Sequence, residues 1–302
     1  MLKNLVLAIA SLALFILIGL GIMLGPAHLQ IWSIEETLPD IDLVTNSDLL
    51  AGPDTPVSIT YINTATQVTP LGTLGHPGVL VTWADGRAFL IDSGMNRADA
   101  QAFGKPLELF LRAKPTQTFG PIEQQMDAQI NLVQGIGFTH LHSDHTSGVT
   151  AICNAMAKPA TIYQTLRQAG VQNLHTSDGQ AIIDASACEH RTLGDERIKP
   201  VAGFPGLVAI AAAGHTPGST IWATRVDGVI WVFAGDIANS LSDLKADRPK
   251  GFIYSYLLIP ENTAQLAKWR QWLNRIDARA DTRVLVAHDI YAFESSPLAH
   301  WQ

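Results

Sequence analysis

Residues 139 to 145 read Thr139-His140-Leu141-His142-Ser143-Asp144-His145, so three histidines and an aspartate fall within six residues. Imidazole nitrogens and a carboxylate at this density form a suitable ligand set for a borderline divalent cation such as zinc. The alternative is a polar loop that carries histidines by chance, and ligand candidates further along the chain disfavour it. The cluster therefore predicts a metal site.

The residues around the cluster indicate how its side chains are presented. From Ile136 to Leu141 apolar residues alternate with small or polar ones, which is typical of a buried strand that ends in a loop. On an extended segment His140 and His142 project to the same side and can bind one ion. Asp144 and His145 follow the strand end, where the turning chain can present them to a second ion.

Three later segments share one form, an apolar or small-residue run that ends in a candidate ligand. They are the run from Ala211 to Gly218 around His215, the strand from Ile230 to Asp236, and the strand from Val284 that leads into His288-Asp289. Strand ends and their loops are where catalytic residues usually gather. Alone, His215 or His288 would more often be a structural histidine, but the first cluster favours a ligand role for both.

Taken together, these segments resemble the metallo-β-lactamase fold superfamily from about Val57 to His288. The resemblance rests on five motifs: Asp92-Ser93-Gly94, the His-x-His-x-Asp-His cluster, Gly-His-Thr-Pro-Gly around His215, the Gly-Asp pair that ends at Asp236, and the late His288-Asp289 pair. It implies an α/β protein, a four-layer α/β/β/α sandwich with a dinuclear site at one edge. It also implies that His140, His142 and His215 hold a first metal ion, that Asp144, His145 and His288 hold a second, and that Asp236 bridges both.

Differences from the patterns of individual subfamilies disfavour several functions. Many β-lactamases of this superfamily carry cysteine where Asp236 stands, so antibiotic hydrolysis is not favoured. Flavodiiron proteins carry an acidic residue where His142 stands, so the chain does not resemble them either. Glyoxalase II enzymes resemble the chain around His215 but have a helical region after the last ligand, for which the fourteen residues after His288 are too few. The lactonase branch is closest, although its members often have tyrosine where Asn239 stands.

Charge and motif content complete this interpretation. The net charge of −7 disfavours nucleic acid as a partner, and with it the ribonuclease-type members of the superfamily. No serine or cysteine stands in a nucleophile-elbow context. We therefore expect two Zn²⁺ ions, with iron or manganese as alternatives, in a hydrolase that cleaves a small-molecule ester, lactone, amide or thioester. Two ions about 3.5–4 Å apart lower the pKa of a shared water to near 7, and Asp144 would be the catalytic residue that handles its proton.

Two other functions remain open on the same fold. One is a mononuclear iron oxidoreductase of the sulfur dioxygenase type, which would leave part of the second ligand set unused. The other is a non-catalytic metal-binding module on a decayed scaffold. The complete set of seven ligands disfavours both. The sequence indicates neither the identity of the substrate nor the oligomeric state.

The N-terminus carries an apolar segment. The twenty residues from Leu5 to Leu24 are uncharged, and as a helix they would span about 30 Å, the thickness of a bilayer core. Lys3 precedes the segment and acidic residues follow it, which places the N-terminus in the cytoplasm and the domain in the periplasm or cell exterior. A cleaved signal peptide, with Gly25-Pro26-Ala27 as a poor cleavage site, would instead give a secreted protein. The length of the apolar run favours an uncleaved anchor.

The expected organisation is a membrane anchor or signal segment over residues 1–26, a polar connector over 27–56 that holds the site off the bilayer, and a hydrolase domain over 57–302. Expected strands cover 58–63, 79–83 and 87–91, with a hairpin turn at Ala84-Asp85-Gly86. A helix is expected from Arg97 to Leu111, interrupted near Gly104 and Pro106. Another begins near Pro260 and places Leu266, Trp269, Leu273 and Ile276 on one face.

Supporting roles are expected for a few residues near the site. Asp92 should support the ligands through hydrogen bonds rather than bind metal. His76 lies in a Gly/Pro-rich stretch. A position in a structural turn is favoured for it over a contact with the substrate. Residues 251–258 either pack in the core or line the substrate pocket through Tyr254 or Tyr256.

The remaining cysteines and histidines have weaker signals. Cys153 and Cys188 could form a disulfide in an exported protein, but their spacing does not predict one. Cys153 is expected in a helix as a buried apolar residue. Four histidines lack neighbouring ligand candidates and are expected in the core or on the surface: His28, His175, His190 and His300.

Overall fold

The computed structural model describes residues 2–45 and 48–301. Its strands are β1 (Pro56–Thr69), β2 (Gly72–Trp83), β3 (Ala88–Ile91), β4 (Gln117–Thr118), β5 (Val133–Gly137), β6 (Thr161–Gln164), β7 (Glu189–Thr192), β8 (Lys199–Pro200), β9 (Leu207–Ala211), β10 (Thr220–Val226), β11 (Val229–Phe233), β12 (Thr282–Leu285) and β13 (Ala299–His300). Its α-helices are α1 (Leu2–Trp32), α2 (Ile41–Thr45), α3 (Arg97–Leu111), α4 (Ile122–Met126), α5 (Ser143–Thr146), α6 (Val149–Ala155), α7 (Leu166–Gly170), α8 (Ser177–Asp184), α9 (Leu241–Lys245), α10 (Thr263–Asp277) and α11 (Ile290–Glu294).

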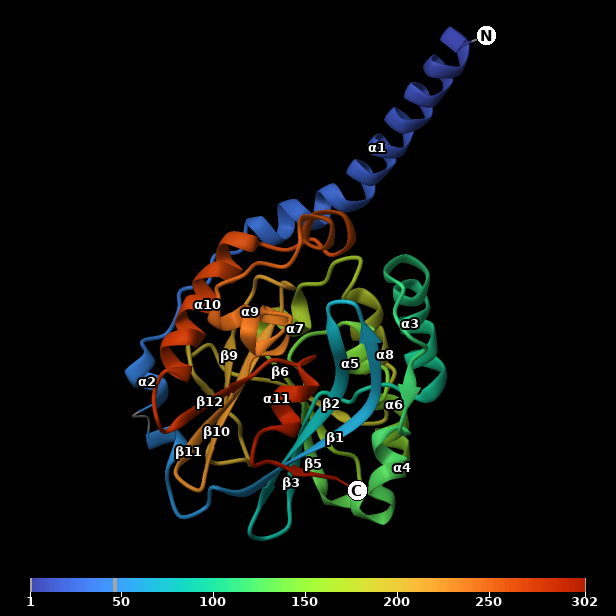
Figure 1. Cartoon of the computed structure of the whole chain (residues 1–302). Helices are drawn as coiled ribbons and strands as arrows, with labels where there is room; N and C mark the ends of the chain where they lie inside the picture. The colour runs from blue at the N-terminus through green and yellow to red at the C-terminus, as the bar shows by residue number, and fades with distance from the viewer. Residues whose placement is uncertain (1, 46–47, 302) are drawn as a thin grey trace.

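Two sheets lie face to face, and helices cover the outer face of each (Figure 1). The larger sheet has the strand order β13-β1-β2-β3-β5-β6-β7, with β4 paired to β1. The smaller sheet has the order β12-β11-β10-β9-β8. The α/β/β/α sandwich expected from the sequence is therefore confirmed.

Three apolar layers hold the sandwich together. Between the sheets, the rings of Phe89 and Trp222 lie 5.1 Å apart in a fully buried cluster. Trp269 of α10 belongs to a second cluster, which fills the space outside the smaller sheet. Ile152 of α6 belongs to a third, outside the larger sheet. Because each sheet is covered on both faces, the polar residues of the site can gather only at the ends of the strands.

The first hairpin is longer than expected, and His76 lies within β2 rather than in a turn. The strand tolerates Pro77 because this residue pairs with Asn63, next to a register shift between Asn63 and Thr66 where the ladder is already irregular. Gly78 leaves room for Ile122, whose Cδ1 would lie 2.6 Å from an added Cβ. Packing of α4 against the hairpin thus explains a Gly/Pro-rich stretch that resembled a loop.

Both expected helices form, with one correction. Helix α10 begins after Asn262, whose side chain accepts a hydrogen bond from Gln265 N, and its predicted apolar face is buried. Helix α3 runs through Pro106 without the expected interruption. At Gly104 a Cβ would lie 1.9 Å from Thr116 Oγ1, so glycine is needed there for close packing and does not break the helix.

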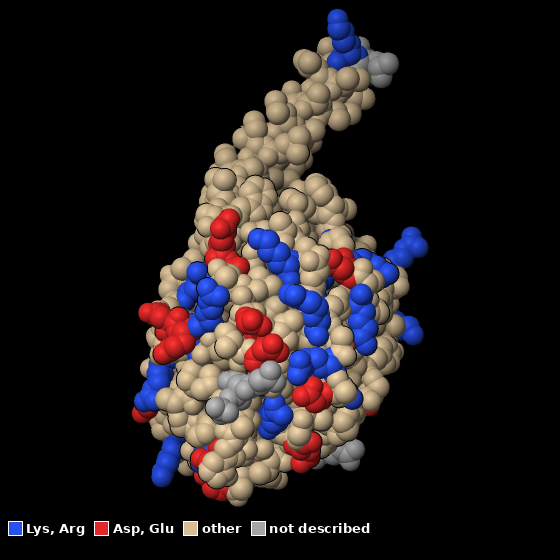
Figure 2. Space-filling view, turned by 90° about the vertical axis from the view of Figure 1, so that its left-hand side faces the viewer, with Lys and Arg blue, Asp and Glu red and all other residues tan. Residues whose placement is uncertain are grey.

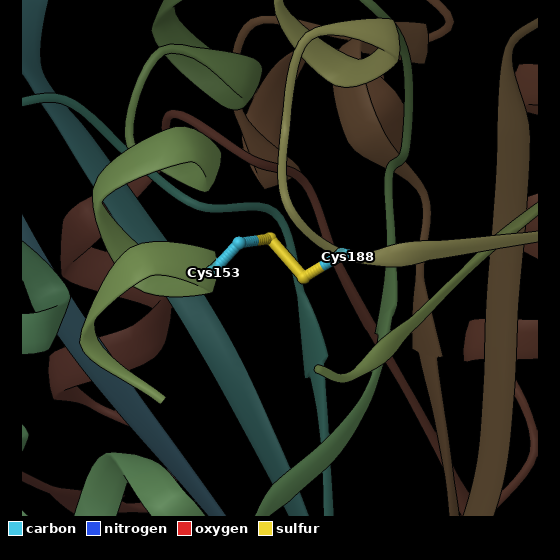
Figure 3. Close-up of a disulfide and its surroundings, with 2 residues drawn as sticks. All are labelled: Cys153 and Cys188. Atoms are coloured by element: carbon cyan, nitrogen blue, oxygen red, sulfur yellow. A yellow bond between two sulfur atoms is a disulfide. The ribbon is translucent and has the colours of Figure 1, made fainter. Parts of the chain in front are cut away.

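Cys153 and Cys188 form a disulfide, a pairing that the sequence left open, and Cys153 is buried as expected (Figure 3). Cys153 does lie on a helix, α6, and Cys188 directly precedes β7. Their Cα atoms are 5.4 Å apart although 35 positions separate them in the chain. The sequence spacing could not show this proximity, because the tertiary fold creates it. A disulfide is typical of a protein that folds in an oxidising compartment outside the cytoplasm.

The N-terminal segment differs most from the expectation. Helix α1 does not end near residue 26 but continues to Trp32, with Leu24, Ala27 and Ile31 buried against the domain. The region expected as a polar connector over residues 27–56 also contributes buried Val44 and Leu50 to the core. The described part of this region is therefore anchored to the domain at several points and is not a free spacer between the domain and α1.

Candidate metal centre

The structure brings all seven predicted ligand residues to one end of the two sheets. His140, His142, Asp144 and His145 follow β5, whereas His215, Asp236 and His288 follow β9, β11 and β12. Their donor atoms, with those of His76, form four overlapping groups whose members lie within 4.8 Å of one another. The seven predicted ligands, which are separated by up to 148 positions in the sequence (140 to 288), thus share one small volume.

The loop after β5 has the conformation that the sequence suggested. The strand ends at Gly137, and His142 caps a short helix, α5, so that Asp144 and His145 lie on its first turn. On the other sheet, Gly235 has a φ of 58°, and a Cβ there would lie 2.8 Å from the Thr139 Cβ. A glycine at this position lets the loop after β11 close against the loop after β5.

Three histidines form the first donor group. His140 Nε2 and His142 Nδ1 are 3.1 Å apart, and His215 completes the group within the same 4.8 Å limit. The rings of His140 and His142 are each 4.7 Å from the ring of His215. This arrangement offers three nitrogen donors to one cation.

The second donor group contains carboxylates as well as histidines. His288 Nε2 lies 3.3 Å from Asp144 Oδ2 and 3.3 Å from Asp236 Oδ1. His145 Nε2 lies 3.5 Å from Asp144 Oδ2. His76, which the sequence did not place in the site, brings its Nδ1 to 3.4 Å from the same Asp144 oxygen.

Asp236 lies between the two groups. Its Oδ2 is 3.5 Å from His215 Nε2 in the first group. Its Oδ1 is 3.3 Å from His288 Nε2 and 3.9 Å from His145 Nε2 in the second. The two oxygens of one carboxylate therefore face two different sets of donors.

Hydrogen bonds orient three of the histidines in the same way. The Nδ1 of His145 donates to Asp92 (2.9 Å), that of His215 to Glu261 (2.6 Å), and that of His288 to the carbonyl of Gly75 (2.9 Å). Because a carboxylate or a carbonyl can only accept, Nδ1 carries the hydrogen in each ring. Nε2 of each ring then faces the centre, which is the arrangement that suits a metal-binding histidine once Nε2 has lost any proton it carries.

Asp92 supports the site as expected. Its carboxylate accepts hydrogen bonds from the backbone nitrogen and the hydroxyl of Thr139, both at 2.7 Å, in addition to the one from His145. Its φ of 61° lies in the left-handed region, which aspartate tolerates better than most residues. The strained backbone directs the carboxylate toward the loop after β5 and thereby fixes His145.

The buried donor atoms fit a divalent cation. Among the described residues, His145 Nε2, His215 Nε2 and Asp236 Oδ1 are buried without a hydrogen-bond partner, an unfavourable state that a bound cation would relieve. Burial, followed by the charges of neighbouring histidines, lowers the pKa of His140 and His142, which keeps both rings neutral. Neutral imidazoles and ionised carboxylates are the ligands that zinc requires.

His145 has a different electrostatic environment. Burial lowers its pKa, but Asp144 and Asp92 more than compensate and raise it to about 10. This histidine therefore carries a positive charge between carboxylates when nothing else balances them. A cation that binds there would replace this proton.

A buried lysine and glutamate that the sequence interpretation missed lie beneath the first donor group. Glu261 is fully buried and accepts from Ser255 Oγ (2.6 Å) as well as from His215. Lys250 Nζ lies 3.2 Å from Glu261 and 3.7 Å from Asp236 Oδ2. Burial raises the pKa of Glu261, but Lys250 and His215 outweigh this and lower it to about 2. In the sequence Glu261 marked only a helix start, because nothing in the spacing relates it to His215.

A cleft of about 520 Å³ opens over the donor groups. Its walls are mainly apolar, with Phe103, Pro106 and Leu107 of α3 on one side and Leu258 and Ile259 on the other. Asp144, Asp236 and His288 lie at its base. The cleft can therefore present an apolar molecule to the polar donors.

The lining of the cleft shows where four residues discussed in the sequence analysis lie. Tyr254 lines it, whereas Tyr256 packs against α1, with its ring 5.8 Å from that of His28. His175, expected in the core or on the surface, also lines the cleft, with its ring 6.1 Å from that of His142. Asn239 lies in the lining as well.

Comparisons with known proteins agree with this geometry. The chain matches the sequence model of the metallo-beta-lactamase superfamily over residues 72–288. A search of curated proteins gives no match. The chain belongs to the metallo-beta-lactamase superfamily, and as a member with a complete donor cluster it is a metal-dependent hydrolase.

Solved structures with the same fold include three hydrolases. An N-acyl homoserine lactone hydrolase with N-hexanoyl-L-homoserine at its catalytic metal centre has a TM-score of 0.58 and 13% identity, and the match covers 81% of this chain and 98% of that one. A probable metal-dependent hydrolase from Staphylococcus aureus has a TM-score of 0.56 and 15% identity, with 79% and 91% covered. A dizinc quorum-quenching lactonase has a TM-score of 0.50 and 15% identity, with 72% and 73% covered.

The hydrogen bond between His215 and Glu261 yields a prediction about metal affinity. Glu261→Gln keeps the shape of the side chain but removes the negative charge that orients His215, so we expect the affinity for Zn²⁺ to fall about 10- to 100-fold. Competition with a chelator of known affinity measures this change. Glu189→Gln, on exposed β7, is the matched control. Unchanged affinity in a folded Glu261→Gln protein would show that Glu261 does not support the site.

Proposed function

We propose that the protein is a dinuclear zinc hydrolase that cleaves a small-molecule ester, lactone, amide or thioester. The observation that carries this proposal is the position of Asp236, whose two oxygens face two separate donor groups. In this assignment His140, His142 and His215 hold one ion, Asp144, His145 and His288 hold the other, and Asp236 bridges them. The nitrogen and oxygen donors, among them the neutral rings of His140 and His142, favour zinc, with iron or manganese as the other candidates.

The bound ions and Asp144 would have different roles in the reaction. Two bound zinc ions supply charge that polarises a carbonyl and makes a water nucleophilic near neutral pH. Burial raises the pKa of Asp144, but His145 and His76 outweigh this and hold it far below its usual range, so the side chain remains a carboxylate. As a carboxylate, Asp144 could accept a hydrogen bond from the attacking water, take the proton that the water loses as it attacks the carbonyl, and then pass this proton to the leaving group.

Tyr254 is a second polar contact for the substrate. Burial, together with the nearby carboxylates, raises the pKa of its phenol despite the opposing charge of Lys250. The phenol therefore stays protonated and can donate a hydrogen bond into the cleft. This side chain provides the hydroxyl that lactonases of the superfamily often carry three residues after the bridging aspartate, where this chain has Asn239.

The substrate class is supported by the walls of the cleft and by similar folds. Apolar side chains dominate the lining, which favours a substrate with a hydrocarbon portion. Two of the solved structures cited above are lactonases that act on acylated lactones. A mononuclear iron oxidoreductase has less support, because it would leave the donors around His288 without a role.

The N-terminal helix supports a membrane location. Residues Lys3–Trp32 are long and apolar enough to cross a bilayer, and their most apolar 18-residue window has a mean hydropathy of 2.9. A signal sequence passes the same test, but cleavage near Ala27 would cut a helix whose last third is packed on the domain through Leu24 and Ile31. We therefore propose an uncleaved anchor, with the domain outside the cytoplasm.

Replacement of the bridging carboxylate tests the dinuclear assignment. Asp236→Ala should reduce bound zinc below two ions per chain and abolish hydrolysis of a panel of chromogenic esters, lactones and a cephalosporin. Elemental analysis and initial rates measure both effects. Asp184→Ala, on exposed α8, should change neither. An Asp236→Ala protein that keeps two ions and its rate would show the bridging assignment to be wrong.

The proton-handling role of Asp144 has its own test. Asp144→Asn keeps the size of the side chain but removes its basic oxygen, so we expect turnover to fall ~10²–10⁴-fold. Initial rates, measured at zinc concentrations that saturate both proteins, give the comparison, with Asp184→Asn as the control. A rate within a few-fold of that of the native enzyme would show that Asp144 does not transfer the proton.

The orientation is tested with a reporter enzyme that is active only after export, fused after residue 302. We expect activity from the full chain and none from a fusion that lacks residues 1–32. The full chain should also stay in the membrane fraction after a high-salt wash. Activity of a cytoplasm-only reporter would refute the orientation, whereas a shortened soluble chain that begins near His28 would show that the segment is a cleaved signal.

A further inference from the structure

The docked end of α1 lies directly beside the mouth of the cleft. His28 Nε2 is 3.0 Å from the carbonyl of Tyr256, and Trp32 Nε1 donates to the carbonyl of Glu261 at 3.1 Å. Tyr256 belongs to the π-helical turn η4 (Tyr254–Leu258), whose Tyr254 and Leu258 line the cleft. Leu174 lines both the cleft and a small hollow beneath Met23 and Ala27 of α1. One wall of the cleft is therefore also the surface on which the helix rests.

Each wall of the cleft continues outward into exposed apolar side chains. On the η4 wall these are Phe252 (69% exposed), Ile253 and Leu257, and on the α3 wall they are Leu109 and Phe110 (77% exposed). The β2 wall, with Leu74 in the lining, leads to Leu71 at the tip of the β1–β2 hairpin, which is 88% exposed. We call these six residues the apolar rim. A soluble domain rarely leaves so many large apolar side chains exposed around one opening.

The rim and α1 lie at the same end of the domain. Figure 1 shows α1 leaving from the end toward which the β1–β2 hairpin points. The C-terminal end of α3 is tied to this hairpin, since Lys114 N donates to Val68 O at 2.8 Å. In Figure 2 the projecting part of α1 shows no charge except at its basic tip, whereas charged side chains are spread over the body of the domain. A bilayer crossed by α1 would thus begin where the rim is.

Charges next to the rim fit a lipid surface. No acidic or basic residue occurs from Gly251 to Pro260. Exposed Arg112 and Lys114 directly follow the apolar end of α3, where they can reach lipid phosphates. The nearby Glu108 carboxylate is paired with Lys105 at 2.8 Å.

We infer that the apolar rim rests on the bilayer and that the substrate is a membrane-borne amphiphile. Its acyl chain would enter the cleft from the lipid side, along the walls formed by α3 and η4, and its ester, lactone, thioester or amide group would reach the donors at the base. The substrate class rests on the proposed hydrolase function. The contact of the rim with lipid does not rest on that function; it rests on the proposed membrane anchor and on the position of α1.

A first experiment measures lipid contact without using activity. Both native cysteines are paired, so Phe110→Cys, Phe252→Cys and Phe119→Cys each give a single thiol for an environment-sensitive dye. The labelled full-length proteins are reconstituted in phosphatidylcholine–phosphatidylglycerol vesicles, with or without brominated acyl chains. We expect quenching of the dyes at 110 and 252 but not at 119, an exposed phenylalanine outside the rim and the cleft. Equal quenching at all three positions, or none at 110 and 252, would overturn the contact.

A second experiment tests the substrate class with p-nitrophenyl esters of a four-carbon acid in solution and of a sixteen-carbon acid in the vesicles. Phe110→Asp combined with Phe252→Asp should slow hydrolysis of the long ester at least about tenfold, since two phenylalanines lose their burial in lipid. The short ester should be unaffected, because neither residue lines the cleft. Phe119→Asp is the control. An equal loss on both esters, or no preference of the native enzyme for the long ester in vesicles, would overturn the amphiphile assignment.

The two experiments separate the failure of each proposal. Dye quenching at the rim together with no hydrolysis of either ester or of any member of the chromogenic panel would overturn the proposed hydrolase function and with it the substrate class, while lipid contact would stand. Hydrolysis of the short ester without rim quenching would support the hydrolase function and overturn the membrane-borne substrate.

Discussion

The burial of charged and polar donors at the ends of two sheets is the constraint on which this structure depends. His140, Asp144, His215 and Asp236 are all less than a tenth exposed, and buried polar atoms are costly unless something satisfies them. Hydrogen bonds to Asp92, Glu261 and the Gly75 carbonyl satisfy the outward nitrogens of three histidines. The Nε2 atoms of these histidines, which face the centre, remain available to bind cations. The same bonds that make burial tolerable also fix the direction in which each histidine can bind metal.

The layered fold provides the rigidity that this arrangement needs. Apolar clusters on both faces of each sheet fix the strands, so the loops that follow β5, β9, β11 and β12 start from defined positions. Close approach between loops then depends on small residues, such as Gly235 against Thr139. A site built from four strand ends is precise because each ligand lies only a few residues from a packed strand.

The N-terminal helix connects this chemistry to its surroundings. It packs on η4 and on the segment around Leu174, which also form part of the cleft. An anchor on a free tether would allow the cleft to face any direction. Under the proposed membrane anchoring, the docked helix would instead set the orientation of the opening relative to the bilayer. The disulfide between Cys153 and Cys188 is consistent with a domain that faces an oxidising compartment.

The sequence by itself determined the fold class, the family, the seven residues that gather at the site and the apolar N-terminal segment. It could do so because a dense His/Asp cluster and strand-end ligands are local patterns, and local patterns are visible along a chain. Helix α10 was equally predictable, since its apolar spacing and its Asn262 cap lie within fifteen residues.

Only the tertiary structure decided which residues support those ligands and where the anchor lies. The contacts of Glu261 with His215, of His76 with Asp144 and of Cys153 with Cys188 join residues that are distant in the chain, and no periodicity records such pairs. The long β1–β2 hairpin, the uninterrupted α3 and the docked end of α1 also depended on packing. In each case tertiary contacts outweighed the local preference of glycine, proline or a polar segment for a turn or a free connector.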